Sequence, residues 1–141
     1  MRRTLCFMFA FGLLAAAAHA QPLTPQRINA LNNLQEEFTA CGVYYRAEIS
    51  CATPEWKAKL QTQLDPVLKL FDLMVVSIGS NIGMTQDAIE QRLRRNVDQQ
   101  SRLTNGKVCI NIDSLSARYE ARCKQLAEHP EAIMDEYLRR P

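Results

Sequence analysis

The sequence predicts an all-α fold: a small antiparallel helical bundle of four main helices plus a short C-terminal helix, stapled by two disulfides. Three observations support this expectation. Apolar residues recur at steps of three and four through most of the chain, which is the period of helices with one buried face. Proline and glycine fall between these stretches, where helices begin and end. The cysteines outside the N-terminal segment number four, an even count typical of small exported proteins.

The N-terminal segment has the features of a signal peptide. Two arginines precede an apolar core at residues 5–18, and the sequence Ala-His-Ala at 18–20 supplies the small residues of a cleavage site. An uncleaved anchor is the alternative, but this core is shorter than the roughly 20 residues that span a bilayer. We therefore expect residues 1–20 to be a cleaved signal peptide and residues 21–141 to form a single helical domain. The expected compartment is the periplasm, with secretion to the medium as the alternative.

The first helix is predicted over about residues 25–49. Thr24 followed by Pro25 is a typical start, with an N-cap side chain and a proline in the first turn. Apolar side chains then follow a single stripe from Ile28 onward, and Cys41 lies on this inner face. The stripe stays in phase across Gly42, so one helix is expected rather than two.

A second Thr-Pro pair, Thr53-Pro54, predicts the start of the second helix. Its apolar stripe runs from Trp56 to Ile78, and between Leu73 and Ile78 the helix is apolar on nearly all sides, which indicates burial on several sides. Pro66 removes one hydrogen bond from the middle of this helix. Because the stripe keeps its phase through Pro66, a kink is favoured over a break.

Shorter stretches predict the remaining helices. Thr85 caps the third helix, whose inner face is expected to contain Ile89, Leu93 and Val97 and to fade toward Leu103. An Asn-Gly turn at 105–106 precedes the fourth helix. That helix is expected to start at Asp113 or Ser114, with an inner face of Leu115, Tyr119, Cys123 and Leu126. A His-Pro pair at 129–130 separates it from a short final helix over 131–140.

The helix lengths also predict how the cysteines pair. Consecutive helices joined by short connections run antiparallel, so Cys51 and Cys109 fall at the same end of the bundle. Cys41 precedes Cys51 by about 15 Å of helix, and Cys123 lies at a similar depth in the fourth helix. The predicted disulfides are therefore Cys41–Cys123 and Cys51–Cys109. A Cys41–Cys51 bridge requires the first helix to break at Gly42. The third pairing, Cys41–Cys109 with Cys51–Cys123, would twice join a cysteine at the end of the bundle to one near its middle.

Charge and composition exclude several function classes. The formal net charge is +2, but the signal peptide contains two of the 17 basic residues and none of the 15 acidic ones. The remaining chain is neutral, so neither a nucleic-acid partner nor a polybasic membrane surface is expected, and the mature form contains no membrane span. The cysteine spacings match no zinc, redox or haem motif, and no metal or other cofactor is expected.

Two surfaces remain as candidate interaction sites. Arg92, Arg95 and Arg102 recur at helical spacing on the third helix, either as a docking face for an anionic partner or as an ordinary solvated face. Leu73 and Val76 belong to the apolar stretch of the second helix, which is either a buried central helix or a dimer or partner interface. His129 and the pairs Glu36-Glu37 and Glu128/Glu131 belong to no catalytic constellation, so their simpler interpretation is as turn, cap and surface residues.

These observations favour a non-enzymatic exported protein that serves as an interaction or accessory module of the cell envelope. An envelope protein or a second copy of the chain would be its partner. The alternative is a carrier of small apolar ligands, or an enzyme, with a pocket between helices near Pro66.

Overall fold

The computed structural model describes residues 23–139, and within them five helices follow one another without a strand. The expected signal peptide lies outside the described residues. The helices are α1 (Pro25–Cys51), α2 (Pro54–Asn81), α3 (Gln86–Leu103), α4 (Ile112–Glu128) and α5 (Pro130–Arg139). The fold is thus the predicted all-α bundle of four main helices and a short last one.

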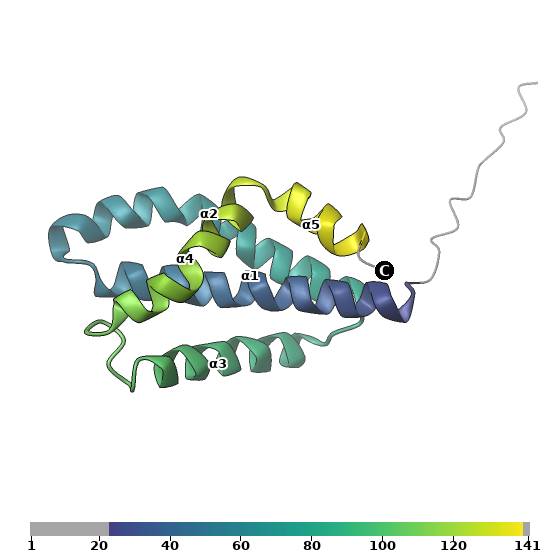
Figure 1. Ribbon diagram of the computed structural model, residues 1–141, viewed down its shortest axis with the longest axis horizontal. Coiled ribbons are helices and arrows are strands. Elements are labelled where there is room, and N and C mark those ends of the chain that lie inside the picture. The colour runs from purple at the N-terminus through teal and green to yellow at the C-terminus, as the bar shows by residue number, and fades with distance from the viewer. Residues whose placement is uncertain (1–22, 140–141) are drawn as a thin grey trace, which may run out of the picture.

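The helix starts follow from local chemistry. Thr24 Oγ1 accepts a hydrogen bond from the Arg27 backbone N–H at 3.2 Å, and Thr85 Oγ1 accepts one from the Ala88 N–H at 3.2 Å. Each threonine therefore satisfies one of the amide groups that a helix N-terminus leaves unpaired. The helix α2 runs unbroken through Pro66, as expected, and its ribbon bends near the middle (Figure 1).

The first helix is the centre of the bundle. The helix α1 contacts all four others, with α3 on its lower side and α5 on its upper side in Figure 1. Phe38 of α1 meets Phe71 of α2 edge to face, with ring centroids 5.3 Å apart. Burying each such ring contributes about 2–3 kcal/mol. The side chains with the deepest burial come from α1, α2 and α4: Leu34, Phe38, Tyr44, Phe71, Leu115 and Leu126.

Two disulfides join α1 to the second half of the chain, in the pairing that the helix heights predict. Cys41 is bonded to Cys123, with Cα atoms 5.3 Å apart, and Cys51 is bonded to Cys109, with Cα atoms 4.9 Å apart. The first bond lies in the core between α1 and α4. The second ties the last residue of α1 to the connection between α3 and α4.

Three expectations about the core are wrong. Trp56 does not enter it: the first turns of α2 extend past the other helices, and the indole is 59% exposed beneath the Lys59 ammonium, which lies 4.6 Å from the ring centroid. Leu93 and Val97 do not form the inner face of α3, because polar side chains of α3 contact α1 instead. The stretch from Leu73 to Ile78 is not buried all round, since Leu73 is 65% exposed.

Adjacent acids on α1 pair with two different helices. Residues one apart on a helix point about 100° away from each other, so Glu36 and Glu37 face different neighbours. Glu36 accepts a hydrogen bond from Asn96 of α3 at 2.7 Å. Glu37 accepts one from Arg122 Nε of α4 at 2.9 Å. The two acids therefore join α1 to α3 and to α4, and they are not the plain surface pair that the sequence suggests.

None of the helices in the described part of the chain is apolar over a stretch long enough to cross a membrane.

Candidate functional site

The α3 helix packs on α1 through polar side chains. Arg92 is its main contact, with a side chain only 14% exposed. Its Nη2 donates to Asn32 Oδ1 at 3.0 Å, and its Nη1 donates to the Asn32 carbonyl at 3.3 Å and to Gln35 Oε1. Its Nε lies 3.1 Å from Glu36 Oε2, an ion pair in which the Nε–H is not aligned for a hydrogen bond.

One and two turns further along α3, the same polar row continues. Asn96 and Gln100 are buried, and Gln100 Nε2 donates to the Ala40 carbonyl of α1 at 2.8 Å. This row fixes the rotation of α3 about its own axis. Leu93 and Val97 therefore point away from α1, toward the side on which α2 lies, and remain 42% and 49% exposed.

The helices α2 and α3 meet at one end and diverge toward the other. At the meeting point Gly79 is buried, and a Cβ atom placed on it would lie 2.8 Å from Ile89 Cδ1. Any larger residue here would require the Ile89 side chain or α3 itself to shift. Away from this end, the contact between α2 and α3 is far smaller than the contact that α2 makes with α1, and a groove opens between them with α1 as its floor.

The groove consists of two hollows that share a narrow middle. The smaller has a volume of about 190 Å³ and is lined by Phe38, Gly42, Val75, Val76 and Ile89 among others. The larger has a volume of about 570 Å³ and is lined by Val43, Ala47, Val97, Val108 and the Cys51–Cys109 disulfide among others. Both linings are mainly apolar, and both include Leu93 of α3.

An ion pair spans the groove between the two hollows. Arg46 Nη2 of α1 donates to both carboxylate oxygens of Asp72 on α2, at 2.8 and 2.7 Å, and both residues line both hollows. Gly42 lies one turn before Arg46, and a Cβ atom there would come within 3.0 Å of Arg46 Nη1. Because both side chains are largely exposed, the pair itself contributes little stability. Its clearest effect is to divide the groove.

The structure separates the candidate residues of the sequence into two groups. Arg92 is not part of an exposed basic face, because its guanidinium is bound to α1. Arg95 and Arg102 are exposed on α3. Val76 lines the smaller hollow and is 46% exposed, and Leu73 lies about one turn before it on α2. The groove is thus lined mainly by apolar side chains, and Arg95 and Arg102 are not among the residues that line it.

Sequence reasoning missed the groove for a specific reason. Its α3 wall consists of Leu93 and Val97, which have the spacing of a core-facing stripe, and nothing local distinguishes a stripe that faces a groove from one that faces a core. The sequence does contain one indication of the face that packs on α1, which is the row of polar residues Arg92, Asn96 and Gln100 at intervals of four. Such a row either is solvated or, as here, packs on another polar row.

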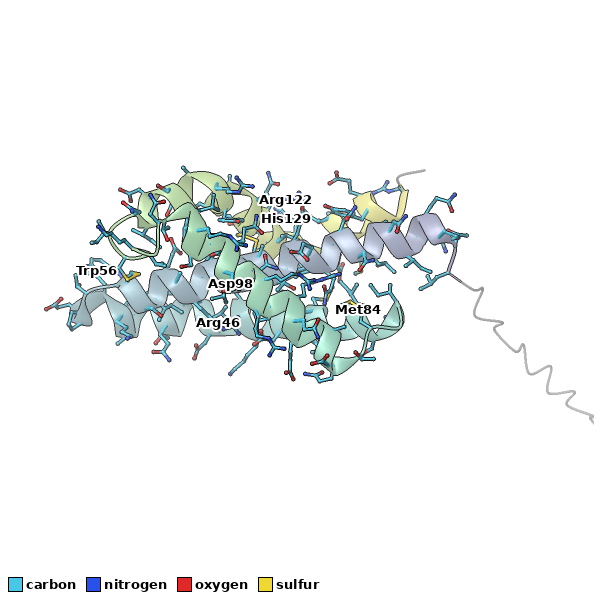
Figure 2. All side chains as sticks on the ribbon, turned by 90° about the horizontal axis from the view of Figure 1, so that it is seen from below. Arg46, Trp56, Met84, Asp98, Arg122 and His129 are labelled. Carbon is cyan, nitrogen blue, oxygen red and sulfur yellow. A yellow bond between two sulfur atoms is a disulfide. The ribbon has the colours of Figure 1, made fainter. Side chains whose placement is uncertain are left out.

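Other polar clusters lie away from the groove, and Figure 2 shows Arg122 on the opposite side of α1 from the groove residue Arg46. Tyr44 donates a hydrogen bond to Glu48 Oε1 at 2.5 Å and lies 3.2 Å from Ser116 Oγ. Burial raises the pKa of the Glu48 carboxyl, the hydrogen bond from Tyr44 lowers it in part, and the nearby Glu120 raises it further. Burial likewise raises the pKa of Tyr44. These groups stabilise the junction of α1 and α4 and lie outside the groove.

Few polar side chains line the groove. Its polar members are Arg46, Asp72 and Glu90 with a few amides and hydroxyls, and Arg46 and Asp72 already satisfy each other. Among residues 23–139, no cluster of three histidine, cysteine or carboxylate side chains has the geometry to hold a metal ion. His129 is exposed at the junction of α4 and α5, where it ends α4.

The described residues thus form a helical bundle with two disulfides and a long, mainly apolar groove. The two disulfides fit an exported protein. Comparison with protein-family models, with curated proteins and with solved structures finds no match to the chain.

Proposed function

We propose that the protein is an exported interaction module of the cell envelope, without enzymatic activity, that binds an amphipathic helix of a partner protein in the groove between α2 and α3. The observation that carries the proposal is the apolar wall of α3. Leu93 and Val97 are held toward solvent by the polar contacts of Arg92 with α1. Exposed apolar side chains gathered along one groove are typical of protein-binding sites.

The dimensions of the groove suit a helix. The floor on α1 extends from Phe38 to Cys51, which corresponds to about 20 Å of helix, or roughly three and a half turns of a docked helix of similar length. Leu73 and Leu103 are large exposed apolar residues of α2 and α3, the helices that form the walls of the groove, and they line neither hollow. A small ligand inside a hollow leaves them exposed, whereas a helix about 10 Å wide extends over the rims.

The Arg46–Asp72 pair suggests a register for the partner. The α1 residues that line the smaller hollow are centred near residue 41 and those that line the larger near residue 47, so the two centres lie about 9 Å apart along α1. Side chains seven residues apart on a helix share one face at about this spacing. The proposed partner helix therefore has two bulky apolar residues at i and i+7, with a small or polar residue between them over the ion pair.

The compartment in this proposal is the periplasm. It rests on the signal-like segment at residues 1–20 and on the disulfides, which persist in oxidising compartments. Sequencing the N-terminus of the protein purified from its own cells tests this part: the proposal expects Gln21 as the first residue.

Binding of designed peptides tests the helix-binding site. The probe is a fluorescent 14-residue helical peptide with leucines at i and i+7, and the control peptide has the same composition with its leucines on opposite faces. We expect saturable binding of the first peptide only. Leu93→Asp should weaken it at least about tenfold, because a charge then replaces the apolar contact at the centre of the groove.

Trp56→Asp is the matched protein control, because Trp56 is also a large exposed apolar residue but lies outside both hollows. This variant should bind the peptide as the unmodified protein does. Equal binding of the two peptides, or equal loss in the Leu93 and Trp56 variants, contradicts the proposal.

A small apolar ligand is the second candidate, and the larger hollow favours it. Its volume of about 570 Å³ lies within the range of small-molecule sites. This hollow is bounded by α1, α3 and the Cys51–Cys109 disulfide, and Pro66 is not among the residues that line it. Native mass spectrometry of protein from its own compartment distinguishes the two candidates. A retained small mass supports the ligand, and a bare polypeptide mass counts against it.

A further inference from the structure

The two disulfides differ in their access to solvent. Cys41 and Cys123 are 2% and 0% exposed, so the bond between them is sealed in the core. Cys109 is exposed and Cys51 is half-buried, and both line the larger hollow of the groove. A thiol in solution can therefore approach the Cys51–Cys109 bond directly, whereas the Cys41–Cys123 bond becomes accessible only when the core opens.

The accessible disulfide connects parts of the fold that few other bonds hold together. It ties the end of α1 to residues 104–111, the connection between α3 and α4. The hydrogen bonds of this connection run within it and to the end of α3: Thr104 Oγ1 donates to the carbonyls of Gln100 and Ser101, and Asn111 Nδ2 donates to the Thr104 carbonyl. These bonds keep the connection folded on α3, but none of the three joins it to α1.

The half of α3 next to this connection is held more weakly than the other half. Arg92 and the buried Ile89 fix the N-terminal half on α1 and α2. In the C-terminal half, Asn96 donates one hydrogen bond to Glu36 and Gln100 donates one to the Ala40 carbonyl, while the Gln100 Oε1 is buried without a hydrogen-bond partner. A buried oxygen without a hydrogen-bond partner opposes the contact, because the loss of its hydration is not compensated. The covalent tie is therefore the firmest link between this half of α3 and α1.

We propose that Cys51–Cys109 is a redox-sensitive latch, whose opening by a dithiol reductant frees the C-terminal half of α3 and widens the larger hollow. One thiolate of the reductant attacks Cys109 Sγ, the S–S bond breaks, and Cys51 leaves as a thiolate that takes up a proton. The second thiol of the reductant then attacks the mixed disulfide and releases Cys109. Two electrons pass from the reductant, which becomes a disulfide, to the two cysteines. The proposal goes beyond the proposed function and stands without it.

The order of reduction tests the accessibility of the latch. The oxidised, unmodified protein is exposed to graded dithiothreitol, free thiols are trapped with N-ethylmaleimide, and each cysteine is mapped by mass spectrometry. We expect Cys51 and Cys109 to be labelled at least about tenfold faster than Cys41 and Cys123, because only their disulfide is open to solvent. Simultaneous labelling of all four cysteines, or labelling in the reverse order, overturns the proposal.

Hydrogen exchange of the partly reduced protein tests the consequence. We expect the amides of residues 97–111 to exchange at least about tenfold faster once the latch is open, while residues 31–41 keep their protection. The double variant Cys51→Ser with Cys109→Ser should reproduce this pattern without a reductant. Unchanged exchange at 97–111 overturns the proposal, as does a uniform rise over the whole chain. Neither measurement uses a partner peptide, so failure of the proposed function leaves this test intact.

Discussion

At the scale of single residues, the groove depends on one glycine and on a few polar side chains that pair with residues of another helix. Gly79 lets α2 and α3 touch at one end, and Arg92 fixes the rotation of α3 by contacts with α1. The Arg46–Asp72 pair divides the space that results. Each of these roles depends on a residue in another helix.

Gly79→Ala tests the close contact between α2 and α3. The new methyl group would meet Ile89 Cδ1 at 2.8 Å and Gln35 Nε2 at 3.3 Å, so the Ile89 side chain or α3 itself must shift. We expect the free energy of unfolding to fall by about 1–3 kcal/mol, as is usual for an overpacked core. Urea denaturation followed by circular dichroism measures it. Gly83→Ala is unsuitable as a control because its φ of +80° is itself strained for alanine, so Ser80→Ala on the exposed side of α2 serves instead.

Glu48→Gln tests the buried carboxyl beside Tyr44. Burial raises the pKa of Glu48 in the folded protein, so the folded state binds its proton more tightly than the unfolded state does. The contribution of Glu48 to stability is therefore greatest in acid and declines as the pH rises from its ordinary pKa of 4.5 through the raised value. We expect the glutamine variant to lack this decline when the free energy of unfolding is measured against pH. An identical pH profile in both proteins would contradict the assignment.

At the scale of elements, α3 shows how far the sequence predicts this fold. The Thr caps, the Thr-Pro starts and the apolar period predict where α1, α2 and α3 begin, because those signals are local. The observed start of α4 is Ile112, one or two residues before the predicted one, and α5 starts at Pro130. The orientation of α3 was not predictable, since Arg92 finds its partners 57 and 60 residues away.

The polar face of α3 predicts opposite effects for two substitutions. Arg92→Met should lower the free energy of unfolding by about 2 kcal/mol or more, because it leaves Glu36 and the Asn32 side chain without a cationic partner. Gln100→Met should be neutral or stabilising by up to about 1 kcal/mol, because it removes the buried, unpaired Oε1. Thermal unfolding of both variants at one pH checks the contrast, and comparable destabilisation by the two would contradict this account of α3.

At the scale of the whole molecule, both disulfides start from α1, the central helix that contacts all the others. The bonds Cys41–Cys123 and Cys51–Cys109 span 82 and 58 residues of sequence. Their pairing was predictable because antiparallel helices of known rise place cysteines at calculable heights. The groove was not predictable, since it arises where α2 and α3 fail to fill the space over α1. That is a property of tertiary packing and not of any one helix.

Removing either disulfide should destabilise the protein substantially. In the chain-entropy description, each long loop contributes about 4 kcal/mol, against a typical total of about 5–15 kcal/mol for a domain. We expect Cys41→Ala with Cys123→Ala to lower stability more than Cys51→Ala with Cys109→Ala, because the core pair also leaves a cavity among Phe38 and its neighbours. Denaturation curves of the two double variants measure the difference, and the reverse order contradicts this placement.

The groove itself is tested most directly by methyl nuclear magnetic resonance of the oxidised protein titrated with the peptide that carries leucines at i and i+7. The account predicts saturable shifts of the methyl groups of Val76, Leu93 and Val97, all of which line the hollows, while those of the fully buried Leu34 and Leu115 stay in place. Shifts confined to methyl groups outside the groove, such as those of the exposed Ile110, or no saturable shift at all, would show that the space between α2 and α3 is not a docking site.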